Sequence, residues 1–418
     1  MKQILYILFC TLTTVLFSSC KSSFIAIERG SIAQSDEAFI SYLKNKGIET
    51  SDSNSVELLN GAHAKFKRLL SDISRAKHHI HLEYFNFRND SINAVVIEAL
   101  AKKAAEGVEV RALFDDFGNL SNNKPLKKRH IEAIREKGIQ IEKFDPIKFP
   151  WVNHINHRDH RKIVVIDGHI GYIGGINVAD YYLTGLEGVG KWRDMHARVE
   201  GNAVSDLQRV FLDMWNHETG EKIGGNSYFL TTGAQGASRI AVVDRCPPKT
   251  ANNMRRSYAN AINAAKDSIQ IVSPYFIPTY LVRRAIKKAL KDSVKVEIMI
   301  SSKSDISFTP DATMYTAYKL MKKGATVHMY DGGFNHAKVM AVDGTFCTIG
   351  SANLNSRSLR YDYECNIFIF DKEETGTMIE YFHKDKEESF PMTRKYWKSR
   401  PLWNRFCGWL GYLLTPFM

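Results

Sequence analysis

One short pattern of residues occurs twice in this chain of 418 residues. In each copy a His is followed by one variable residue, a Lys, four further residues and an Asp. A small-small-x-Asn sequence begins seven residues after the Asp. The first copy runs from His160 to Asn177 and the second from His336 to Asn353. Two copies of so specific a pattern predict a duplicated fold in which both halves contribute equivalent side chains.

The residues between the Lys and the Asp of each copy are apolar. Ranges 163–166 and 339–342 read as short buried strands, each closed by an Asp-Gly turn. Side chains alternate between the faces of a strand, so the His and the Lys point one way and the Asp the other. We count all six residues as candidate catalytic residues: His160, Lys162, Asp167, His336, Lys338 and Asp343. The alternation further predicts that the two aspartates stabilise the turns, whereas the His and Lys pairs form the working face.

The repeat extends beyond the signature. Segments 76–85, 107–114 and 138–141 have echoes at 265–276, 293–300 and 324–327, and helical patterns lie between them. Strands alternating with helices predict layered α/β domains with mixed sheets. We therefore expect two homologous α/β/α sandwich domains, related by a pseudo-twofold axis, with one active site at their interface. The predicted divisions are a signal or lipoprotein-like segment (1–20), a Ser-rich tether with one short helix (21–55), a first domain (56–225), a linker (226–240), a second domain (241–392) and a basic, aromatic tail (393–418).

The N-terminus carries an apolar run. Residues 4–17 follow Lys2 and precede Ser18, Ser19 and Cys20. The run is too short to span a bilayer comfortably and is typical of a signal-peptide core. Small residues directly before a Cys predict lipidation of Cys20, while an uncleaved anchor and an ordinary secretory signal stay open. All three readings place the body at or across a membrane of a bacterial envelope.

Composition narrows the class of partner. The net charge is +12 and the pI about 9.2, which favours nucleic acid, anionic lipid or a phosphorylated substrate. The six cysteines show no pairing pattern that would indicate a disulfide framework. Basic residues within 124–129 would suit DNA, but a solvated helix start explains them as well, and nucleic acid is the less favoured partner.

Several stretches around the two signatures resemble a known family. They are Asn156–Lys162, Gly174–Tyr182, Trp192–His196, Ser273–Pro278, Gly350–Leu359 and Tyr363–Asn366. Together they resemble the phospholipase D superfamily, and within it the bacterial cardiolipin synthases, over residues 56 to 392. The resemblance implies a phosphatidyltransferase that works through a phosphohistidine intermediate. It also implies an anionic phospholipid substrate at a membrane surface, and it implies no cofactor.

The resemblance and the side-chain chemistry assign roles in the site. His160 would be the nucleophile and His336 the general acid and then the base. Phosphate would be held by the two signature lysines together with Asn177 and Asn353, and Ser351 would either add a hydroxyl or only serve its turn. Because the signature aspartates face away, Asp194 and Glu364 are the candidates for orienting the imidazoles. His154, His157 and His160 recur every three residues, but the flanking ligands of a zinc site are missing, so we expect no metal.

Three functions are compatible with the sequence. The first is a phosphatidyltransferase. The second is a hydrolase, either a phospholipase D or a phosphodiesterase such as an endonuclease, that uses water at the same site. The third is a binding protein without activity, which the two intact signatures disfavour. The tail contains aromatic residues within 401–418 and predicts a membrane-interface helix, with a cap over an apolar groove as the alternative. We expect a monomer whose two halves form an internal pseudo-dimer.

Overall fold

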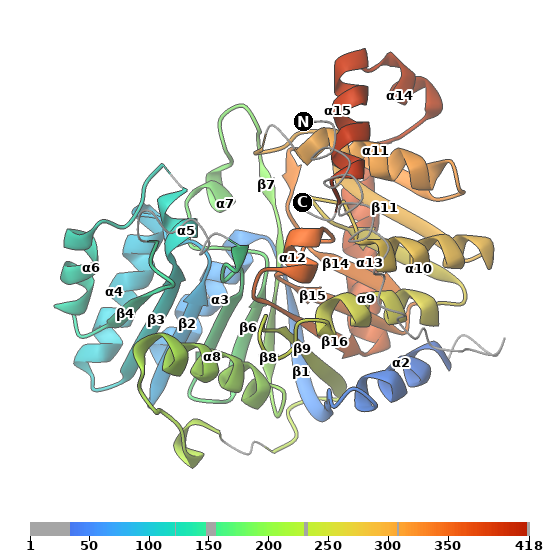
Figure 1. The fold of residues 1–418 in the computed structure, drawn as a ribbon. Helices are drawn as coiled ribbons and strands as arrows, with labels where there is room; N and C mark the ends of the chain where they lie inside the picture. The colour runs from blue at the N-terminus through green and yellow to red at the C-terminus, as the bar shows by residue number, and fades with distance from the viewer. Residues whose placement is uncertain (1–33, 122, 148–155, 230–232, 307–308, 416–418) are drawn as a thin grey trace, which may run out of the picture.

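The computed structural model describes residues 34–121, 123–147, 156–229, 233–306 and 309–415. Two repeats of strands and helices lie side by side and share one continuous mixed sheet (Figure 1). The predicted signal and the lipidation candidate Cys20 lie outside the described residues. Within the described part of the chain, no helix combines the length and the apolarity needed to cross a bilayer.

The strands of the two repeats follow the same order. From the outer edge inward, the first repeat runs β4 (Gln140–Phe144), β3 (Glu109–Asp115), β2 (His79–Tyr84), β5 (Lys162–Ile166), β6 (Ile170–Gly174), β8 (Met195–Glu200) and β1 (Thr50–Asn60). The second runs β12 (Thr326–Tyr330), β11 (Lys295–Ser301), β10 (Ser268–Val272), β14 (Val339–Val342), β15 (Phe346–Gly350), β16 (Glu364–Phe370) and β9 (Ser238–Arg245), with β17 (Ser389–Pro391) added at the edge. The predicted duplication and fold class are confirmed.

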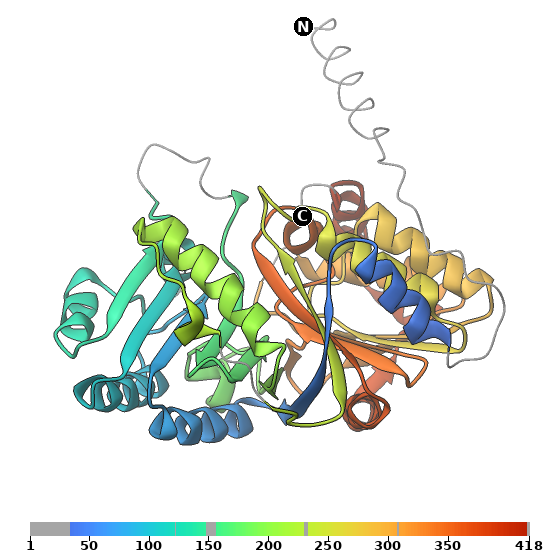
Figure 2. The same cartoon turned by 90° about the horizontal axis from the view of Figure 1, so that it is seen from below.

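Helices cover both faces of the sheet in each repeat. The first repeat carries α3 (Ala62–Arg75), α4 (Ser91–Ala105), α5 (Asp116–Leu120), α6 (Lys128–Arg135), α7 (Tyr181–Thr184) and α8 (Val204–Thr219), followed by a short 3-10 helix, η2 (Asn226–Tyr228). The second carries α9 (Asn253–Ala264), α10 (Tyr280–Lys291), α11 (Thr309–Met321), α12 (Ser356–Arg360), α13 (Lys372–Glu387), α14 (Arg394–Ser399) and α15 (Leu402–Leu413). In Figure 2, α3 and α4 lie on one side of the sheet and α9 and α10 on the other, as a pseudo-twofold axis requires.

The predicted tether is wrong for residues 34–55. Helix α2 (Gln34–Lys44) buries Phe39 and Leu43 in the core of the second repeat, and β1 lies between β8 and β9 at the centre of the sheet (Figure 2). A β-bulge between Ser51 and Asn54 marks the point where β1 passes from one repeat to the other. The buried Asn54 amide holds this bulge by donating to the Ser238 carbonyl (3.2 Å) and accepting from the Ala203 N–H (2.8 Å). The predicted linker 226–240 likewise ends inside strand β9.

One hydrophobic core spans both repeats. It contains Val165 and Ile173 from the first repeat and Ala341 and Ile367 from the second, all of them buried. Helices α8 and α13 both contribute to it, through Val204, Leu207, Met378 and Phe382. Burial of apolar surface is the dominant favourable term in folding, so this shared core fixes the two halves against each other. A site assembled from both halves is therefore held rigidly.

Candidate active site

The signature aspartates anchor the sheet and do not enter the site. The Asp167 carboxylate accepts hydrogen bonds from the backbone N–H groups of Lys77, His78 and His79 at 2.8, 2.7 and 3.0 Å. Asp343 accepts from the equivalent residues Lys266, Asp267 and Ser268, each at 2.8 Å. Both aspartates have positive φ, 51° and 52°, at the turn that closes the signature strand. Of the six candidate catalytic residues, these two thus fasten each signature hairpin to the start of a neighbouring strand.

The two signature histidines are each paired with a carboxylate from the opposite repeat. His160 Nδ1 lies 2.9 Å from Glu364 Oε1, and His336 Nδ1 lies 2.7 Å from Asp194 Oδ2. A neutral imidazole that donates from Nδ1 to a carboxylate leaves the lone pair of Nε2 free. Each repeat thus supplies a histidine to one half of the site and a carboxylate to the other half.

Backbone pairing between the repeats produces this exchange. Strand β7 (Trp192–Arg193) pairs in parallel with β13 (Phe334–Asn335), and the His336 N–H donates to the Arg193 carbonyl at 2.6 Å. The segment before β5 likewise forms backbone hydrogen bonds with the second repeat. Asp159 forms a parallel bridge with Tyr363, and the His160 N–H donates to the Tyr363 carbonyl at 3.0 Å. In both places the residue after the paired segment is the carboxylate that contacts the histidine, Asp194 or Glu364. Figure 1 shows β7 running along the boundary between the two halves.

A buried ionic network holds the segment that carries His160. The Arg158 guanidinium donates to Asp115 at 2.9 Å, and Arg161 donates to Glu83 at 3.1 Å and pairs with Asp244. Both arginine side chains are almost completely buried. Buried charges need paired and hydrogen-bonded partners, so this network defines one conformation of the segment. The sequence did not predict this network, although Glu83 lies within a predicted strand and Asp115 directly follows another.

The residues after each signature shape the space around the carboxylates. Gly175 lies against the Asp194 carboxylate, and a side chain at position 175 would collide with it. The equivalent residue in the second repeat is Ser351, whose hydroxyl donates to Glu364. The two halves of the site therefore differ: His160 faces a glutamate that also binds a serine, and His336 faces a shorter aspartate beside a glycine.

The lysines and asparagines lie close to the imidazoles. Lys162 Nζ donates to the His160 carbonyl and Lys338 Nζ to the His336 carbonyl, which leaves further N–H donors on each ammonium group. Asn177 lies 3.0 Å from the hydroxyl of Tyr182, whose ring lies 6.1 Å from that of His336. The Asn353 amide lies 3.5 Å from the Ser358 hydroxyl. Within the described residues, the Oδ1 atoms of both asparagines are buried without a hydrogen-bond partner.

Burial controls the charge of the site. It lowers the pKa of His160 to about 4, although the Glu364 carboxylate opposes the shift, and it holds the pKa of His336 well below its usual range. Burial also lowers the pKa of Lys162 to about 7 and that of Lys338 to about 8. Both imidazoles are thus neutral at pH 7. A bound anion would favour the charged form of both lysines.

Burial acts on the orienting carboxylates as well. It raises the pKa of Asp194 to about 6. Burial alone would raise the pKa of Glu364, but His160, Lys162 and Ser351 together hold it below its usual range. Both carboxylates are therefore ionised at pH 7, and they favour the charged forms of the two lysines.

Four aromatic rings surround His336, and one lies against His160. Trp192, Phe334, Tyr182 and Tyr275 have ring centroids 5.3 to 6.2 Å from that of His336. Phe85 lies 5.0 Å from His160, whose side chain is 15% exposed. Such a wall reduces access of water to the reacting groups and strengthens electrostatic interactions between them.

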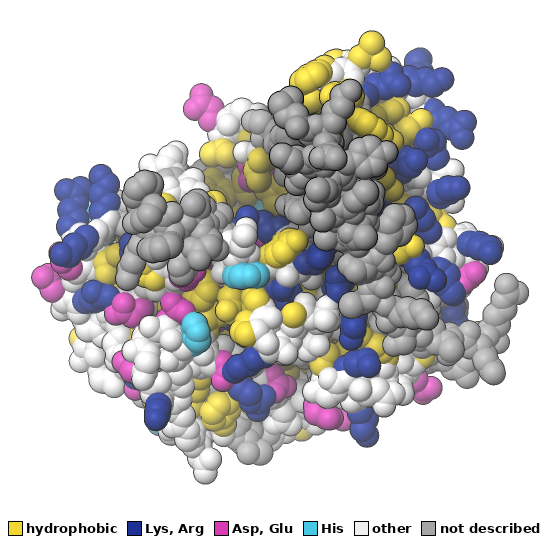
Figure 3. Space-filling view, viewed as in Figure 1, with side chains coloured by type: hydrophobic (Ala, Val, Ile, Leu, Met, Phe, Trp, Pro, Cys, Tyr) yellow, Lys and Arg dark blue, Asp and Glu magenta, His cyan; other side chains and the backbone are white. Residues whose placement is uncertain are grey.

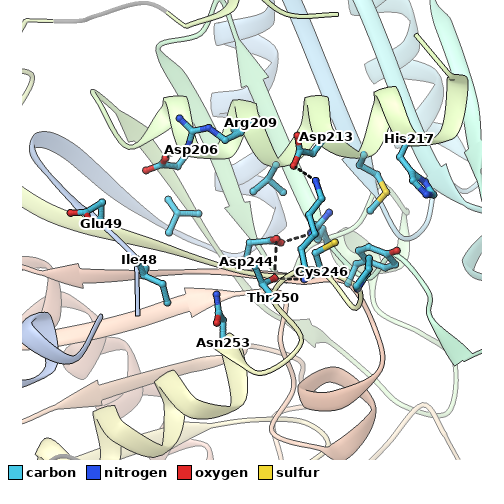
Figure 4. A pocket seen from close by; sticks show the side chains of 18 residues that line it. Ile48, Glu49, Asp206, Arg209, Asp213, His217, Asp244, Cys246, Thr250 and Asn253 are labelled. Carbon is cyan, nitrogen blue, oxygen red and sulfur yellow. Dashed lines mark hydrogen bonds and ion pairs between the residues drawn. The ribbon is translucent and has the colours of Figure 1, made fainter. Parts of the chain in front are cut away.

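A charged hollow lies outside this site. It lies between α8 and β9 and contains Asp213, Asp244 and Cys246 (Figure 4). Its charges pair with each other, as in the contact of 2.9 Å between Lys249 and Asp213.

Among the described residues, no cluster of three His, Cys, Asp or Glu side chains could hold a metal. His154 lies outside these residues, and His157 Nδ1 contacts the Tyr361 carbonyl at 2.8 Å.

Two imidazoles, two lysines and two carboxylates are assembled from a duplicated sheet, an arrangement that suits an enzyme acting on phosphodiesters. The family described as "Cardiolipin synthase, PLD-like domain" matches residues 69–215 and 258–386. Cardiolipin synthase of Listeria monocytogenes serotype 4b is 37% identical over 379 residues, covering 90% of this chain and 78% of that protein. The major cardiolipin synthase of Bacillus subtilis is 37% identical over 395 residues, covering 93% and 80%. The chain belongs to the cardiolipin synthase family of phospholipase D-like proteins.

A solved structure supports the same fold. Phosphatidylserine synthase of Haemophilus influenzae aligns with a TM-score of 0.68, covering 87% of this chain and 95% of that one, at 13% sequence identity. At this identity the likeness shows the fold alone. Family membership makes the protein a phosphatidyltransferase, and phospholipid is its class of substrate.

Proposed function

We propose that this protein makes cardiolipin by transferring a phosphatidyl group from one phosphatidylglycerol to a hydroxyl of a second. The choice of donor and acceptor rests on the likeness to the cardiolipin synthases. One observation in the structure supports the transfer chemistry: each Nδ1 is held by a carboxylate of the opposite repeat, at 2.9 and 2.7 Å. Both Nε2 atoms are then available for the two sides of an in-line displacement.

In the first step, His160 Nε2 attacks the phosphorus of the donor. The phosphorus–oxygen bond to the terminal glycerol breaks, and His336 gives its proton to the departing oxygen. The anionic donor adds a negative charge beside two neutral imidazoles, which raises the pKa of His336 and allows it to carry that proton. Lys162, Lys338, Asn177 and Asn353 stabilise the charge that develops on the phosphate oxygens. The products are free glycerol and a phosphatidyl group bonded to His160.

In the second step, His336 acts as a base. It removes a proton from the hydroxyl of a second phosphatidylglycerol, whose oxygen attacks the phosphorus and displaces His160. Glu364 and Asp194 keep the imidazoles in the required tautomers throughout. One cardiolipin and one glycerol are formed from two phosphatidylglycerol molecules, without a cofactor.

The aromatic wall supports transfer to an alcohol. Water and a lipid hydroxyl compete for the phosphohistidine, and a site enclosed by Trp192, Phe334, Tyr275 and Phe85 limits the access of bulk water. Hydrolysis to phosphatidic acid is the competing outcome of the same chemistry.

Incubation of the purified protein with labelled phosphatidylglycerol tests the proposal. Labelled cardiolipin and stoichiometric glycerol are expected, and added glycerol should slow net synthesis because it reverses the first step. Phosphatidic acid as the main product would instead show a hydrolase. Cleavage of DNA together with inert lipid would show a nuclease.

The proposed location is the membrane of a bacterial envelope. A phosphatidylglycerol substrate requires contact with a bilayer, and Cys20 is the proposed site of N-terminal lipidation. In a bacterial host, Cys20→Ala should block processing and change the mass of the protein. An intact Met1 on the wild-type protein in membranes would favour the uncleaved anchor.

A further inference from the structure

Helix α15 has two unlike faces. The inner face, which packs on α11, contains small and polar residues: a Cβ at Gly408 would lie 2.6 Å from the Asp311 carbonyl. The Asn404 amide donates to the Asp311 carboxylate at 3.1 Å, and the ring of Tyr412 lies 5.4 Å from that of Tyr315. The helix is therefore fixed to the body through Gly408, Asn404 and Tyr412, while its other bulky side chains lie at least partly exposed.

The outer face consists of exposed apolar residues, which we call the tail face: Leu402, Trp403, Phe406, Trp409, Leu410, Leu413 and Leu414. Leu402 is 77% exposed and Trp403 is 71% exposed. The rings of Trp403, Phe406 and Trp409 form a row with centroid separations of 5.7 Å. Within the described residues, the other exposed large hydrophobic side chains are Val95, Leu120, Tyr280 and Ile306, which belong to other elements. A contiguous exposed apolar patch marks an interaction surface.

The charged residues of the segment that carries the tail face are all basic. Residues 393–418 contain five Arg or Lys and no Asp or Glu. Arg394, Lys395 and Lys398 are exposed on α14, directly before the tail face, and Arg400 pairs with Asp311. Figure 3 shows hydrophobic side chains at the upper end of the molecule with Lys and Arg beside them. Two copies of this chain would bring positive charges together if they met through this face. An anionic lipid bilayer offers an apolar interior to the tail face and negatively charged headgroups to the basic residues.

The length of the helix indicates how it would lie. Twelve residues of α-helix extend about 18 Å, which is shorter than the hydrocarbon core of about 30 Å. Trp side chains and basic residues are typical of helices that lie in the headgroup plane of a bilayer. In Figure 1, α14 and α15 project from the same end of the molecule as α7 and β7, which flank the site. Contact with a bilayer at this end would bring the site to the lipid surface.

We propose that the tail face docks the protein on an anionic phospholipid bilayer, with α15 lying in the headgroup plane and the basic residues of α14 on the lipid phosphates. The docking surface stands on its own geometry, whereas its use in catalysis rests on the proposed function. Each basic residue near such a surface contributes about a fivefold gain in affinity at low salt, and this gain fades as salt is added.

The test compares the full-length wild-type protein with the variant Trp403→Ser, Phe406→Ser, Trp409→Ser. Cosedimentation with phosphatidylglycerol–phosphatidylcholine vesicles should show at least tenfold weaker binding of the variant, with unchanged thermal stability. The double variant Val95→Ser, Leu120→Ser removes exposed apolar side chains from other surfaces and should bind like the wild type. Arg394→Gln, Lys395→Gln, Lys398→Gln should weaken binding to anionic vesicles and remove much of the salt dependence.

A spectroscopic readout separates the tail face from any contribution of the N-terminal segment. Trp403 and Trp409 are exposed, whereas Trp192, Trp215 and Trp397 are buried. Trp151 lies outside the described residues and is replaced by Phe in both proteins. Brominated lipid should then quench the fluorescence of the Trp151→Phe protein strongly, and should quench a variant that also carries Trp403→Phe and Trp409→Phe much less. Equal quenching of the two proteins would overturn the proposal.

Activity on a short-chain, water-soluble phosphatidylglycerol distinguishes docking from catalysis. The triple Ser variant should retain turnover of this substrate while losing turnover on vesicles. If the wild type binds vesicles through the tail face but turns over neither substrate, the proposed function fails and the docking surface stands. The docking proposal would be overturned if the triple Ser variant bound vesicles like the wild type, or if its thermal stability collapsed. It would also be overturned if the wild type formed a dimer that the triple Ser substitution dissociates.

Discussion

Replacing Glu364 by Gln removes one charge from the site and keeps the shape of the side chain. Glu364 is completely buried, holds His160 Nδ1 at 2.9 Å and accepts from Ser351. A hydrogen bond to a charged group contributes about 1.5–3 kcal/mol. A change of about 1.4 kcal/mol in the barrier alters the rate tenfold. We therefore expect kcat to fall by about 10- to 150-fold.

The pH profile identifies the cause of that loss. The Glu364 carboxylate raises the pKa of His160 against the effect of burial. Its removal therefore lowers the pKa of His160, so the lower step on the acid limb of kcat/KM, near pH 4, should move to lower pH in the variant, while the step near pH 6 that comes from Asp194 stays in place. A purely structural role for Glu364 would lower the amount of active protein and leave this limb in place.

Asp167→Asn is the matched control. It removes the charge of the carboxylate and replaces the oxygen that accepts from the Lys77 N–H by an amide NH2, while Oδ1 can still accept from His78 and His79, so it should destabilise the fold by about 1–3 kcal/mol with little change in kcat of the folded protein. The assay is turnover of labelled phosphatidylglycerol, with the folded fraction measured by thermal unfolding. The reasoning is refuted if Asp167→Asn lowers kcat more than Glu364→Gln does once folding is accounted for.

Three further predictions concern the same site. His160→Ala and His336→Ala should each abolish turnover while unfolding like the wild type, and substantial turnover by either folded variant would contradict a composite site. The value of kcat/KM should fall as pH rises through about 7, because Lys162 loses the proton with which it binds phosphate. It should also fall when the pH drops below about 6, because Asp194 is then protonated. A flat profile between about pH 5 and about pH 9 would count against these roles. Turnover should persist in a metal chelator, since lysine and asparagine side chains occupy the role of a cation, and loss that a divalent ion restores would oppose this.

The duplicated signature predicted the architecture because repeated residues imply repeated topology. The strand around 162–166 and its echo around 338–342 occupy the same place in the sheet order of their repeats. Alternation along these strands also predicted that Asp167 and Asp343 point away from the His and Lys pairs. Both inferences depend on local periodicity, which the sequence records directly.

The pairing of each histidine with the carboxylate of the opposite repeat could not be predicted from the sequence. The sequence indicates Asp194 and Glu364 as orienting groups, but each follows the signature of its own repeat. Which imidazole each carboxylate contacts is decided by the backbone pairing of β7 with β13 and of Asp159 with Tyr363. Such pairing between distant segments leaves no periodic pattern.

The tether was wrong for a related reason. The first half of β1 is rich in Ser and Asp and lacks the apolar alternation of a strand, because it is partly exposed. It is held in the sheet by two neighbouring strands and by the buried Asn54, which are tertiary interactions. Tertiary context routinely overrides local propensity in strands.

Mass spectrometry of the protein quenched during turnover tests the central claim most directly. With labelled phosphatidylglycerol, the account predicts one covalent phosphatidyl adduct on the peptide that contains His160, and no adduct on the His160→Ala variant. The proton donated by His336 is needed to release the alcohol, so His336→Ala should form the adduct slowly or not at all. An adduct on His336, or turnover without any adduct on histidine, would contradict the account.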